Sequence, residues 1–210
     1  KIVAIDCDEL SVGFHLADRH YVVPFSVEDN YWKEVLKIIR KEEIDVIVPT
    51  GDADIVHFSR NFSMLHDLGV VNFMSNYKTI TTCQDKLSFY NHMYDSGLED
   101  LLPKTSDNHR DISFPKICKP RRGSGSRGIE LWETESQIKE LDKIENLHYS
   151  SDYIFQEYLP GNEYTIDVLC DLKGEILSIV PRQRLQIKAG ISSKGKIIRE
   201  FLCNTPLTFY

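Results

Sequence analysis

Short apolar runs alternate with stretches of helical periodicity over residues 1–77. The runs KIVAI, DVIVP and VVNFMS are typical of strands, and apolar residues recur every three or four positions in the stretches between them, 26–45 and 50–69. DVIVP has the continuous apolar pattern of a strand that is buried on both faces of a sheet. Regular strand–helix alternation predicts an α/β domain, with helices packed on the faces of a parallel sheet.

The pattern changes from residue 78 onward. CQDKLSFYNHMYDSG predicts a helix, and LLPKT, FPKICKP and GIELW predict short strands. Thr134 and Gln137 form a capping box that opens the helical stretch TESQIKELDKIEN. The runs YIFQEYLPG, NEYTIDVLCDLKG and EILSIVPRQRLQI predict three strands of an antiparallel meander. We expect Lys188, Lys194 and Lys196 in RQRLQIKAGISSKGK to lie on a solvated loop, with contact to an acidic substrate as the alternative.

These patterns divide the chain into three parts. An α/β part covers residues 1–77, and two parts of mixed helix and strand content cover 78–149 and 150–210. The chain opens directly in a strand pattern without a Met, and its last residues, CNTPLTFY, carry no clear helix or cap. We therefore expect both ends to be incomplete.

Composition and charge narrow the functional classes. The chain is 41% hydrophobic, and its formal net charge of −7 argues against a general nucleic-acid-binding surface. Five cysteines without a CxxC pair indicate neither a disulfide framework nor a zinc site, which favours a cytoplasmic protein. No apolar run approaches the roughly 20 residues that span a bilayer, and we predict no membrane partner. The basic cluster at 116–127 is a local exception that suggests a small anion as ligand.

That cluster lies in residues 114–132, FPKICKPRRGSGSRGIELW, where cations surround three glycines and two serines between two strand-like runs. Glycine and serine let the backbone turn its N–H groups towards one point, a geometry that suits phosphate oxygens. Lys119, at the end of its strand, would point at the same oxygens. An exposed, flexible hairpin explains the composition about equally well. The loop is not a Walker motif, because no GKS or GKT followed by a helix is present.

A second motif stands about thirty residues further on. In QEYLPGNEYTIDV, Glu157 and Glu163 are separated by a Pro-Gly turn, which predicts that they lie on successive strands of one hairpin. Carboxylates there could accept hydrogen bonds from an adenine amino group and from ribose hydroxyls. For either residue alone, an ordinary charge on a half-exposed hairpin is the simpler interpretation.

Four motifs in order, CQDK, FPKICKPRRGSGSRGIELW, FQEYLPGNEYTIDV and PRQRLQIKAG, resemble the ATP-grasp superfamily. The most similar branch is that of the carbamoyl-phosphate synthase large subunit, whose domain preceding the ATP-binding part resembles DVIVPTGDADI. The resemblance implies a Rossmann-like amino-terminal domain and two α+β subdomains that hold ATP between them. It also implies roles for single residues. Lys86 and Lys119 match phosphate-binding lysines; Gly123, Ser124, Gly125 and Ser126 match the mobile loop over the phosphates; Glu157, Tyr158 and Leu159 match the adenine hinge; Glu163 matches the ribose carboxylate; and Arg182 and Arg184 match catalytic residues near the transferred phosphate and the acceptor.

The resemblance further implies ATP and Mg²⁺ as cofactors, and small-molecule carboxylate and amine substrates joined through an acyl phosphate. The family's metal ligands belong beyond residue 210, so we expect no metal site in this chain and little ATP turnover by it alone. A nucleotide-binding regulatory or degenerate relative without ligase activity is the alternative, and a structural or protein-interaction module is a third class. The sequence is compatible with a homodimer but does not specify an oligomeric state.

Overall fold

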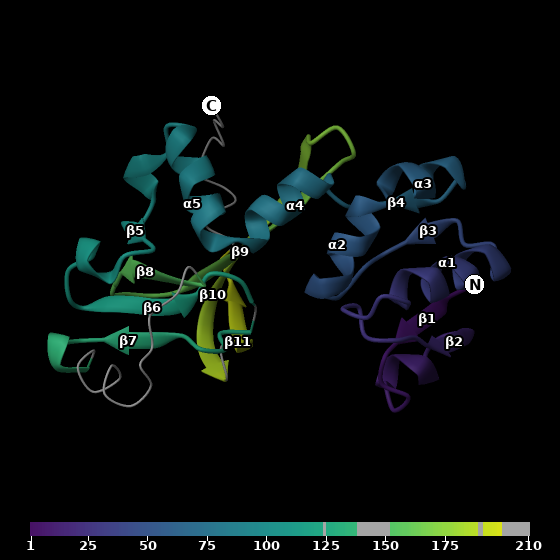
Figure 1. Cartoon of the computed structure of the whole chain (residues 1–210), viewed down its shortest axis with the longest axis horizontal. Helices are drawn as coiled ribbons and strands as arrows, with labels where there is room; N and C mark the ends of the chain where they lie inside the picture. The colour runs from purple at the N-terminus through teal and green to yellow at the C-terminus, as the bar shows by residue number, and fades with distance from the viewer. Residues whose placement is uncertain (124, 138–151, 189–190, 199–210) are drawn as a thin grey trace. The chain divides into compact units, whose positions relative to one another are not determined.

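The structure, a computed structural model, describes residues 1–123, 125–137, 152–188 and 191–198. The chain forms two compact units, Lys1–Thr81 and Thr82–Tyr210, and each is described by itself (Figure 1). The finer division of the second half at residues 149 and 150 stays a prediction.

The first unit is an α/β unit of short parallel strands and helices, as the sequence predicts. Its strands pair as β1 with β2 and β3 with β4, both in parallel. The elements, in chain order, are β1 (Val3–Asp6), the 3₁₀ helix η1 (Val12–His15), β2 (Arg19–Val22), α1 (Tyr31–Lys41), β3 (Val46–Ile47), α2 (Asp52–Arg60), α3 (Phe62–Asp67) and β4 (Val71–Asn72), followed by α4 (Tyr77–Gln84). The sequence pattern missed β2, because Arg19 and His20 interrupt its apolar run.

The core of the first unit lies between the strands and one layer of helices. Apolar residues of α1, α2 and α3 pack there with strand residues, including Ile47 of β3. The expectation that DVIVP is buried on both faces is wrong in this structure: Ile47 is 8% exposed, whereas Val46 and Val48 are 48% and 68% exposed. All three helices cover the face that carries Ile47, and strand residues alternate between faces.

The second unit contains a four-stranded antiparallel sheet with the order β5-β8-β6-β7. Its strands are β5 (Thr105–Ser106), β6 (Lys116–Pro120), β7 (Glu130–Trp132) and β8 (Tyr153–Glu157), and its helices are α5 (Lys86–Asp95), η2 (Glu99–Leu101) and η3 (His109–Asp111). The predicted hairpin around the glycine loop is confirmed, since β6 pairs antiparallel with β7. Cys118, Trp132 and Phe155 of this sheet pack together with Ile112 and form a buried core.

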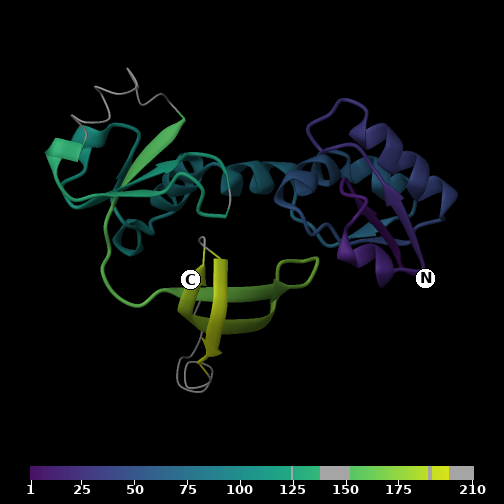
Figure 2. The same cartoon turned by 90° about the horizontal axis from the view of Figure 1, so that it is seen from below.

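The remaining strands form a sheet of their own, seen in green to yellow in Figure 2. It has the order β11-β10-β9, with β9 (Tyr164–Cys170), β10 (Ile176–Lys188) and β11 (Ile191–Ile197) all antiparallel. The predicted meander is therefore wrong in two places. β8 does not pair with β9, because β5 and β6 already occupy both of its edges. The predicted solvated loop around Lys194 is instead the strand β11.

Two further expectations concern helices. Residues 135–137 are helical, and the Gln137 side chain accepts a hydrogen bond from the Thr134 amide at 3.1 Å, as in a capping box; the rest of that predicted helix lies outside the described residues. No helix in the described part of the chain is long and apolar enough to cross a membrane.

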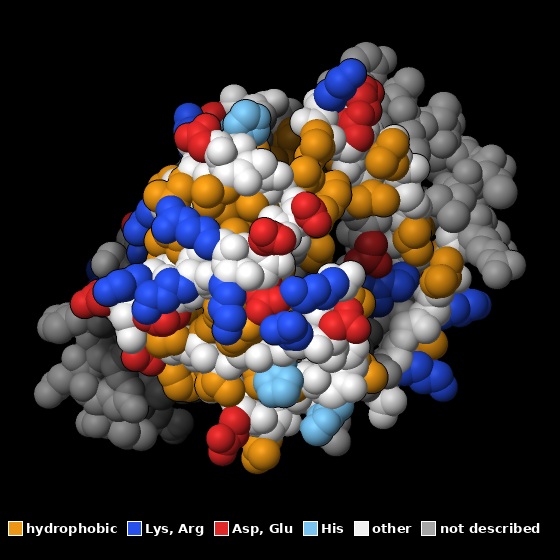
Figure 3. All heavy atoms as spheres, turned by 90° about the vertical axis from the view of Figure 1, so that its right-hand side faces the viewer, with side chains coloured by type: hydrophobic (Ala, Val, Ile, Leu, Met, Phe, Trp, Pro, Cys, Tyr) orange, Lys and Arg blue, Asp and Glu red, His pale blue; other side chains and the backbone are white. Residues whose placement is uncertain are grey.

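The surface charge is mixed. On the face in Figure 3, Lys and Arg side chains lie beside Asp and Glu side chains, so this face is not uniformly basic.

Candidate functional site

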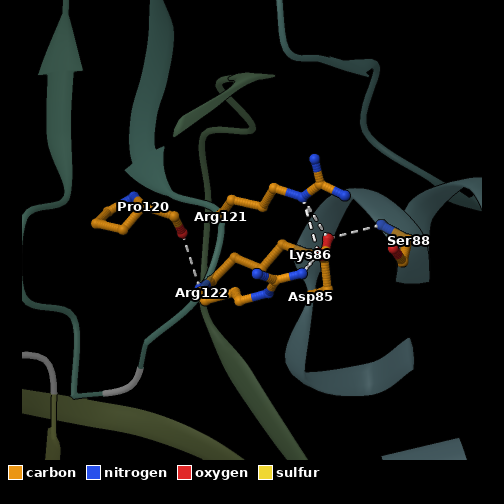
Figure 4. Close-up of polar contacts among 6 residues, drawn as sticks. All are labelled: Asp85, Lys86, Ser88, Pro120, Arg121 and Arg122. Carbon is orange, nitrogen blue, oxygen red and sulfur yellow. Dashed lines mark hydrogen bonds and ion pairs between the residues drawn. The ribbon is translucent and has the colours of Figure 1, made fainter. Parts of the chain in front are cut away.

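Asp85 connects the start of α5 with the end of β6. As the N-cap of α5, its Oδ1 accepts a hydrogen bond from the Ser88 amide at 3.0 Å. The Arg121 Nε donates to both carboxylate oxygens at 2.7 and 2.8 Å, and the Arg122 Nη2 donates to Oδ2 at 2.9 Å (Figure 4). The Lys86 amide also donates to the Arg121 carbonyl at 3.0 Å. The lysine-bearing helix is thereby held against the base of the glycine loop.

The Asp85 carboxylate is buried, with 2% of the residue exposed. Burial by itself would raise its pKa, but the hydrogen bonds from Arg121 and the Ser88 amide, with the charges of both arginines, hold the pKa at about 2. Asp85 is therefore ionised at neutral pH and compensates the charge of the two arginines.

The hydrogen bonds of Lys86 and Lys119 go to neutral acceptors. The Lys86 Nζ donates to the carbonyls of Pro120 and Gly123 at 2.9 and 3.1 Å, and the Lys119 Nζ donates to the Gln156 Oε1 at 2.6 Å. Burial lowers the pKa of both lysines. The charge of Asp85 opposes this effect in part at Lys86, whereas the charge of Lys86 lowers the pKa of Lys119 further. Among the described residues, each ammonium group thus has neutral acceptors, and the two charges repel each other. A bound polyanion would relieve that repulsion.

The loop that follows β6 has the backbone geometry expected for contact with an anion. Gly123 and Gly125 adopt φ of 122° and 69°, a region that side chains disfavour, and Ser126 also has a positive φ of 55°. Turns that contain such residues can direct amide groups towards a common point. Ser124, the remaining predicted loop residue, lies outside the described residues.

The predicted adenine hinge starts where β8 ends. The Glu157 amide donates to the Lys104 carbonyl at 2.9 Å, and the Glu157 Oε2 accepts from the Lys104 amide at 3.2 Å. Tyr158 and Leu159 follow with exposed side chains. Gln156, which accepts the hydrogen bond from Lys119, directly precedes Glu157 in β8. That Lys119 and the hinge bind one ligand stays a prediction.

Glu163 and the two predicted catalytic arginines lie in the other sheet of this unit. Glu163 forms an ion pair with Arg184, and Asp167 accepts hydrogen bonds from Arg182 at 2.5 and 3.0 Å. The hydrogen bond from Arg182 lowers the pKa of Asp167. The predicted placement of Glu157 and Glu163 on one hairpin is wrong, since their strands belong to different sheets. No described contact joins Glu163 to Lys86, Lys119 or Glu157.

Sequence reasoning missed residues that organise the site. Asp85 and Gln156 were not singled out, and Arg121 and Arg122 counted only as part of a basic cluster. One signal was available: Asp directly before a helical stretch is a common N-cap. The arginine partners of Asp85 lie 36 and 37 positions away along the chain, so no local sequence pattern indicates them.

The carboxylates of the described residues decide whether Mg²⁺ could bind here. In the part of the chain that the structure describes, no group of three or more His, Cys, Asp or Glu side chains is placed to hold a metal ion. Glu163 and Asp167, the acidic residues of β9 and its approach, are engaged by arginines. The described residues therefore do not fit a magnesium site, whereas the two lysines and the glycine loop fit a polyphosphate.

Comparison with known proteins shows the family of the chain. The family model for the ATP-grasp domain matches residues 83–200, more than half of the chain, and the model for the PylC-like N-terminal domain matches residues 1–73. The chain belongs to the ATP-grasp family. The arginine-specific large chain of carbamoyl phosphate synthase from Halalkalibacterium halodurans is 24% identical to it over 172 residues, covering 78% of this chain and 16% of that protein. The D-alanine–D-alanine ligase of Thermotoga petrophila is 26% identical over 189 residues, covering 87% of this chain and 60% of the ligase.

Solved structures share the fold at low sequence identity. The biotin carboxylase domain of Hydrogenobacter thermophilus 2-oxoglutarate carboxylase, solved with MgADP, ADP and bicarbonate, has a TM-score of 0.65 at 19% identity, over 90% of this chain and 46% of that one. An L-amino acid ligase from Bacillus licheniformis has a TM-score of 0.59 at 15% identity, over 79% of this chain and 40% of that one. This ATP-grasp chain thus spans 16% to 60% of the length of these four proteins.

Proposed function

We propose that this protein is an ATP-dependent ligase that activates a small-molecule carboxylate. A carboxylate oxygen attacks the γ-phosphorus of ATP, ADP leaves, and an amine then attacks the acyl carbon and expels phosphate. The observation that carries the proposal is the pair of neighbouring lysines, Lys86 and Lys119, whose described hydrogen-bond acceptors are all neutral. Family membership supports the use of ATP, and the carboxylate–amine substrate class follows the ligases among its relatives.

The described residues suit the demands of phosphoryl transfer, which depends mostly on positioning and charge neutralisation. The two lysines would neutralise phosphate oxygens, and the amides around Gly123 and Gly125 would cover them. Closure of this loop would exclude water, which hydrolyses acyl phosphates. The hinge after Gln156 would bind the adenine, with Glu157 and the backbone of Tyr158 and Leu159.

The roles proposed for Glu163, Arg182 and Arg184 require that a ligand reach residues that already form ion pairs. Arg184 engages one carboxylate oxygen of Glu163, so a ribose hydroxyl would bind the other oxygen. Arg182 would have to leave Asp167, or act with it, to reach a transferred phosphate. The ligand would therefore have to compete with ion pairs that already exist.

Those ion pairs favour one alternative, a nucleotide-binding protein without ligase turnover. In that case ATP would bind through the lysines, while the arginines of β10 would serve the sheet alone. Phosphate release separates the two functions when it is measured on a longer protein that supplies the metal ligands expected beyond residue 210. A ligase releases phosphate only when a carboxylate and an amine are both added, whereas the alternative binds ATP and releases none under any substrate pair.

Binding itself is tested by thermal unfolding with ATP. At a ligand concentration of 100 times Kd, binding stabilises the native state by about 2.7 kcal/mol. Lys119→Ala should abolish most of that stabilisation, and Lys173→Ala, which removes an exposed lysine of the same unit, should preserve it. Equal stabilisation of both variants by ATP would refute the proposed role of Lys119.

A further inference from the structure

Two arginines share one buried carboxylate at the base of the glycine loop, and their contacts with it differ. The Arg121 Nε donates to both oxygens of Asp85, at 2.7 and 2.8 Å, and the Arg121 side chain is 26% exposed. The Arg122 Nη2 donates to one oxygen at 2.9 Å, and the Arg122 side chain is 75% exposed. Figure 4 shows both side chains extending to Asp85 from the chain that follows Pro120. Arg121 is therefore the more firmly held of the two.

The Asp85 carboxylate does not depend on Arg122 for its hydrogen bonds. Its Oδ1 also accepts from the Ser88 amide at 3.0 Å and from Arg121, and its Oδ2 also accepts from Arg121. Both oxygens thus keep a donor if Arg122 leaves, and the charge of Arg121 still balances that of the carboxylate. The departure of Arg122 costs only an exposed ion pair, which contributes little to stability.

Arg121, in contrast, is held by several acidic residues. The hydrogen bond to Asp85 raises the pKa of Arg121; burial opposes this effect, and the charges of Asp107 and Asp152 add to it. The Arg121 amide also donates to the Asp152 carbonyl at 2.6 Å, which fixes the backbone at this position. We therefore expect Arg121 to stay in place, whereas Arg122 is the arginine that this cluster can release.

Arg122 lies beside the phosphate-binding groups proposed above. It stands in the chain between Pro120 and Gly123, whose carbonyls accept hydrogen bonds from the Lys86 Nζ at 2.9 and 3.1 Å. The Lys86 ammonium group consequently lies against the segment that carries Arg122. Gly123, the next residue, has a φ of 122° and begins the glycine loop. A ligand that contacts both Lys86 and the loop amides would therefore lie next to Arg122.

The charge and shape of this segment favour a phosphate as that ligand. Lys86 and Arg122 carry two positive charges, and the hydrogen bonds of Lys86 go to neutral carbonyls. A guanidinium group presents planar N–H donors that match two oxygens of one phosphate, which an ammonium group cannot do. Exchange of the exposed contact with Asp85 for a charge-assisted contact with phosphate is accordingly favourable.

We propose that Arg122 is a further phosphate-binding residue, which leaves Asp85 and binds the polyphosphate when ATP binds. Arg121 remains on Asp85 and keeps α5 against the end of β6. The inference rests on the proposed binding of ATP by Lys86 and Lys119. A purely structural role for Arg122, as a second partner of Asp85, predicts instead that loss of Arg122 lowers stability without a specific loss of phosphate binding.

Calorimetric titration of the 210-residue chain with ATP and with adenosine tests the proposal. Arg122→Gln should lower the ATP affinity about fivefold to tenfold and leave the adenosine affinity unchanged, because adenosine carries no phosphate. Arg122→Lys keeps the charge but not the planar donors, so it should lose less ATP affinity than Arg122→Gln. Lys173→Gln, which removes one exposed positive charge from the same unit, is the matched control and should bind ATP like the parent.

The outcomes separate this inference from the proposed function. An unchanged ATP affinity in Arg122→Gln, beside a loss in Lys119→Ala, would overturn the inference and leave the proposed function standing. An equal loss of ATP and adenosine affinity in Arg122→Gln would also overturn it, since such a loss indicates a structural effect. Absence of ATP binding by the parent chain would overturn the proposed function and the inference together.

The release of Arg122 from Asp85 has a spectroscopic signature of its own. The ¹⁵N–¹H NMR signal of the Arg122 Nε, assigned by its loss in Arg122→Gln, should move when ATP is added and not when adenosine is added. The signal of the Arg121 Nε, whose N–H donates to Asp85, should move less. Equal movement of the two signals, or no movement of the Arg122 signal with ATP, would overturn the proposed exchange.

Discussion

Asp85→Asn is the substitution whose effect follows most directly from the structure. Asparagine keeps the shape of the side chain and can still cap α5, but it removes the charge that binds Arg121 and Arg122. The pKa of Asp85 falls from 3.8 to about 2 in the folded protein. A shift of that size corresponds to about 2.5 kcal/mol of native-state interaction. Because the Arg122 side chain is 75% exposed, solvent screening reduces the expected loss to roughly 1–2 kcal/mol.

The assay is urea unfolding followed by tryptophan fluorescence. The chain has two tryptophans, and Trp132 is buried in the core of the second unit, so a Trp32→Phe background makes the signal specific for that unit. Asp85→Ala should cost about 1 kcal/mol more than Asp85→Asn, because alanine also removes the cap. Arg122→Gln, the control, should cost less than about 1 kcal/mol, since its ion pair is largely exposed.

The pH dependence of the unfolding free energy tests the same charge interaction. The folded-state pKa of Asp85 is depressed, so its contribution to stability is fully present above the unfolded pKa near 3.8 and is lost as pH falls towards 2. The difference in unfolding free energy between the parent and Asp85→Asn should therefore be constant from pH 5 to 7 and shrink between pH 4 and 2. A difference that persists undiminished at pH 2, or none at pH 7, would refute the reasoning.

Three further outcomes follow from single residues. Burial raises the pKa of the Cys118 thiol to about 12, so iodoacetamide at pH 8 should label the exposed cysteines but leave Cys118 unmodified, as read by mass spectrometry; rapid labelling would contradict its burial. Gly128→Ala should destabilise the second unit by about 1–2 kcal/mol in urea, because φ is 71° and the new Cβ would lie 3.0 Å from the Pro120 Cγ; an unchanged midpoint would argue against this loop conformation. Lys116→Met should cost about 1–3 kcal/mol, since the buried ammonium donates to the Ile112 carbonyl at 2.8 Å and its loss leaves that acceptor unpaired; a neutral effect would contradict this hydrogen bond.

The local sequence pattern could predict those features that depend on a short, continuous stretch of the chain. The hairpin of β6 and β7, its glycine loop and the position of Lys119 at the strand end all follow from one 19-residue stretch. The helix that carries Lys86 was also predicted, but its predicted start at Cys83 is wrong. Cys83 and Gln84 end α4, and Asp85 caps α5. The pairing of Glu157 and Glu163 failed because a Pro-Gly turn between two strand-like runs fits either a hairpin or a passage between sheets. Only the partners of β8, which are distant in sequence, decide between them.

Long-range polar contacts were beyond local pattern for the same reason. Asp85 finds its arginine partners across 36 and 37 residues, and Lys119 finds Gln156 across 37. The exposure of Val46 and Val48 is a different kind of failure. There the continuous apolar run predicts burial on both faces, whereas the described residues bury only the face that carries Ile47.

The central claim is that Lys86 and Lys119 hold the phosphates of one nucleotide. Calorimetric titration of the protein and of the Lys86→Ala, Lys119→Ala double variant with ATP and with adenosine tests it directly. The account predicts that the double variant loses at least about tenfold in ATP affinity, or 1.4 kcal/mol, while adenosine binds both proteins equally. ATP binding of undiminished affinity in the double variant would contradict it.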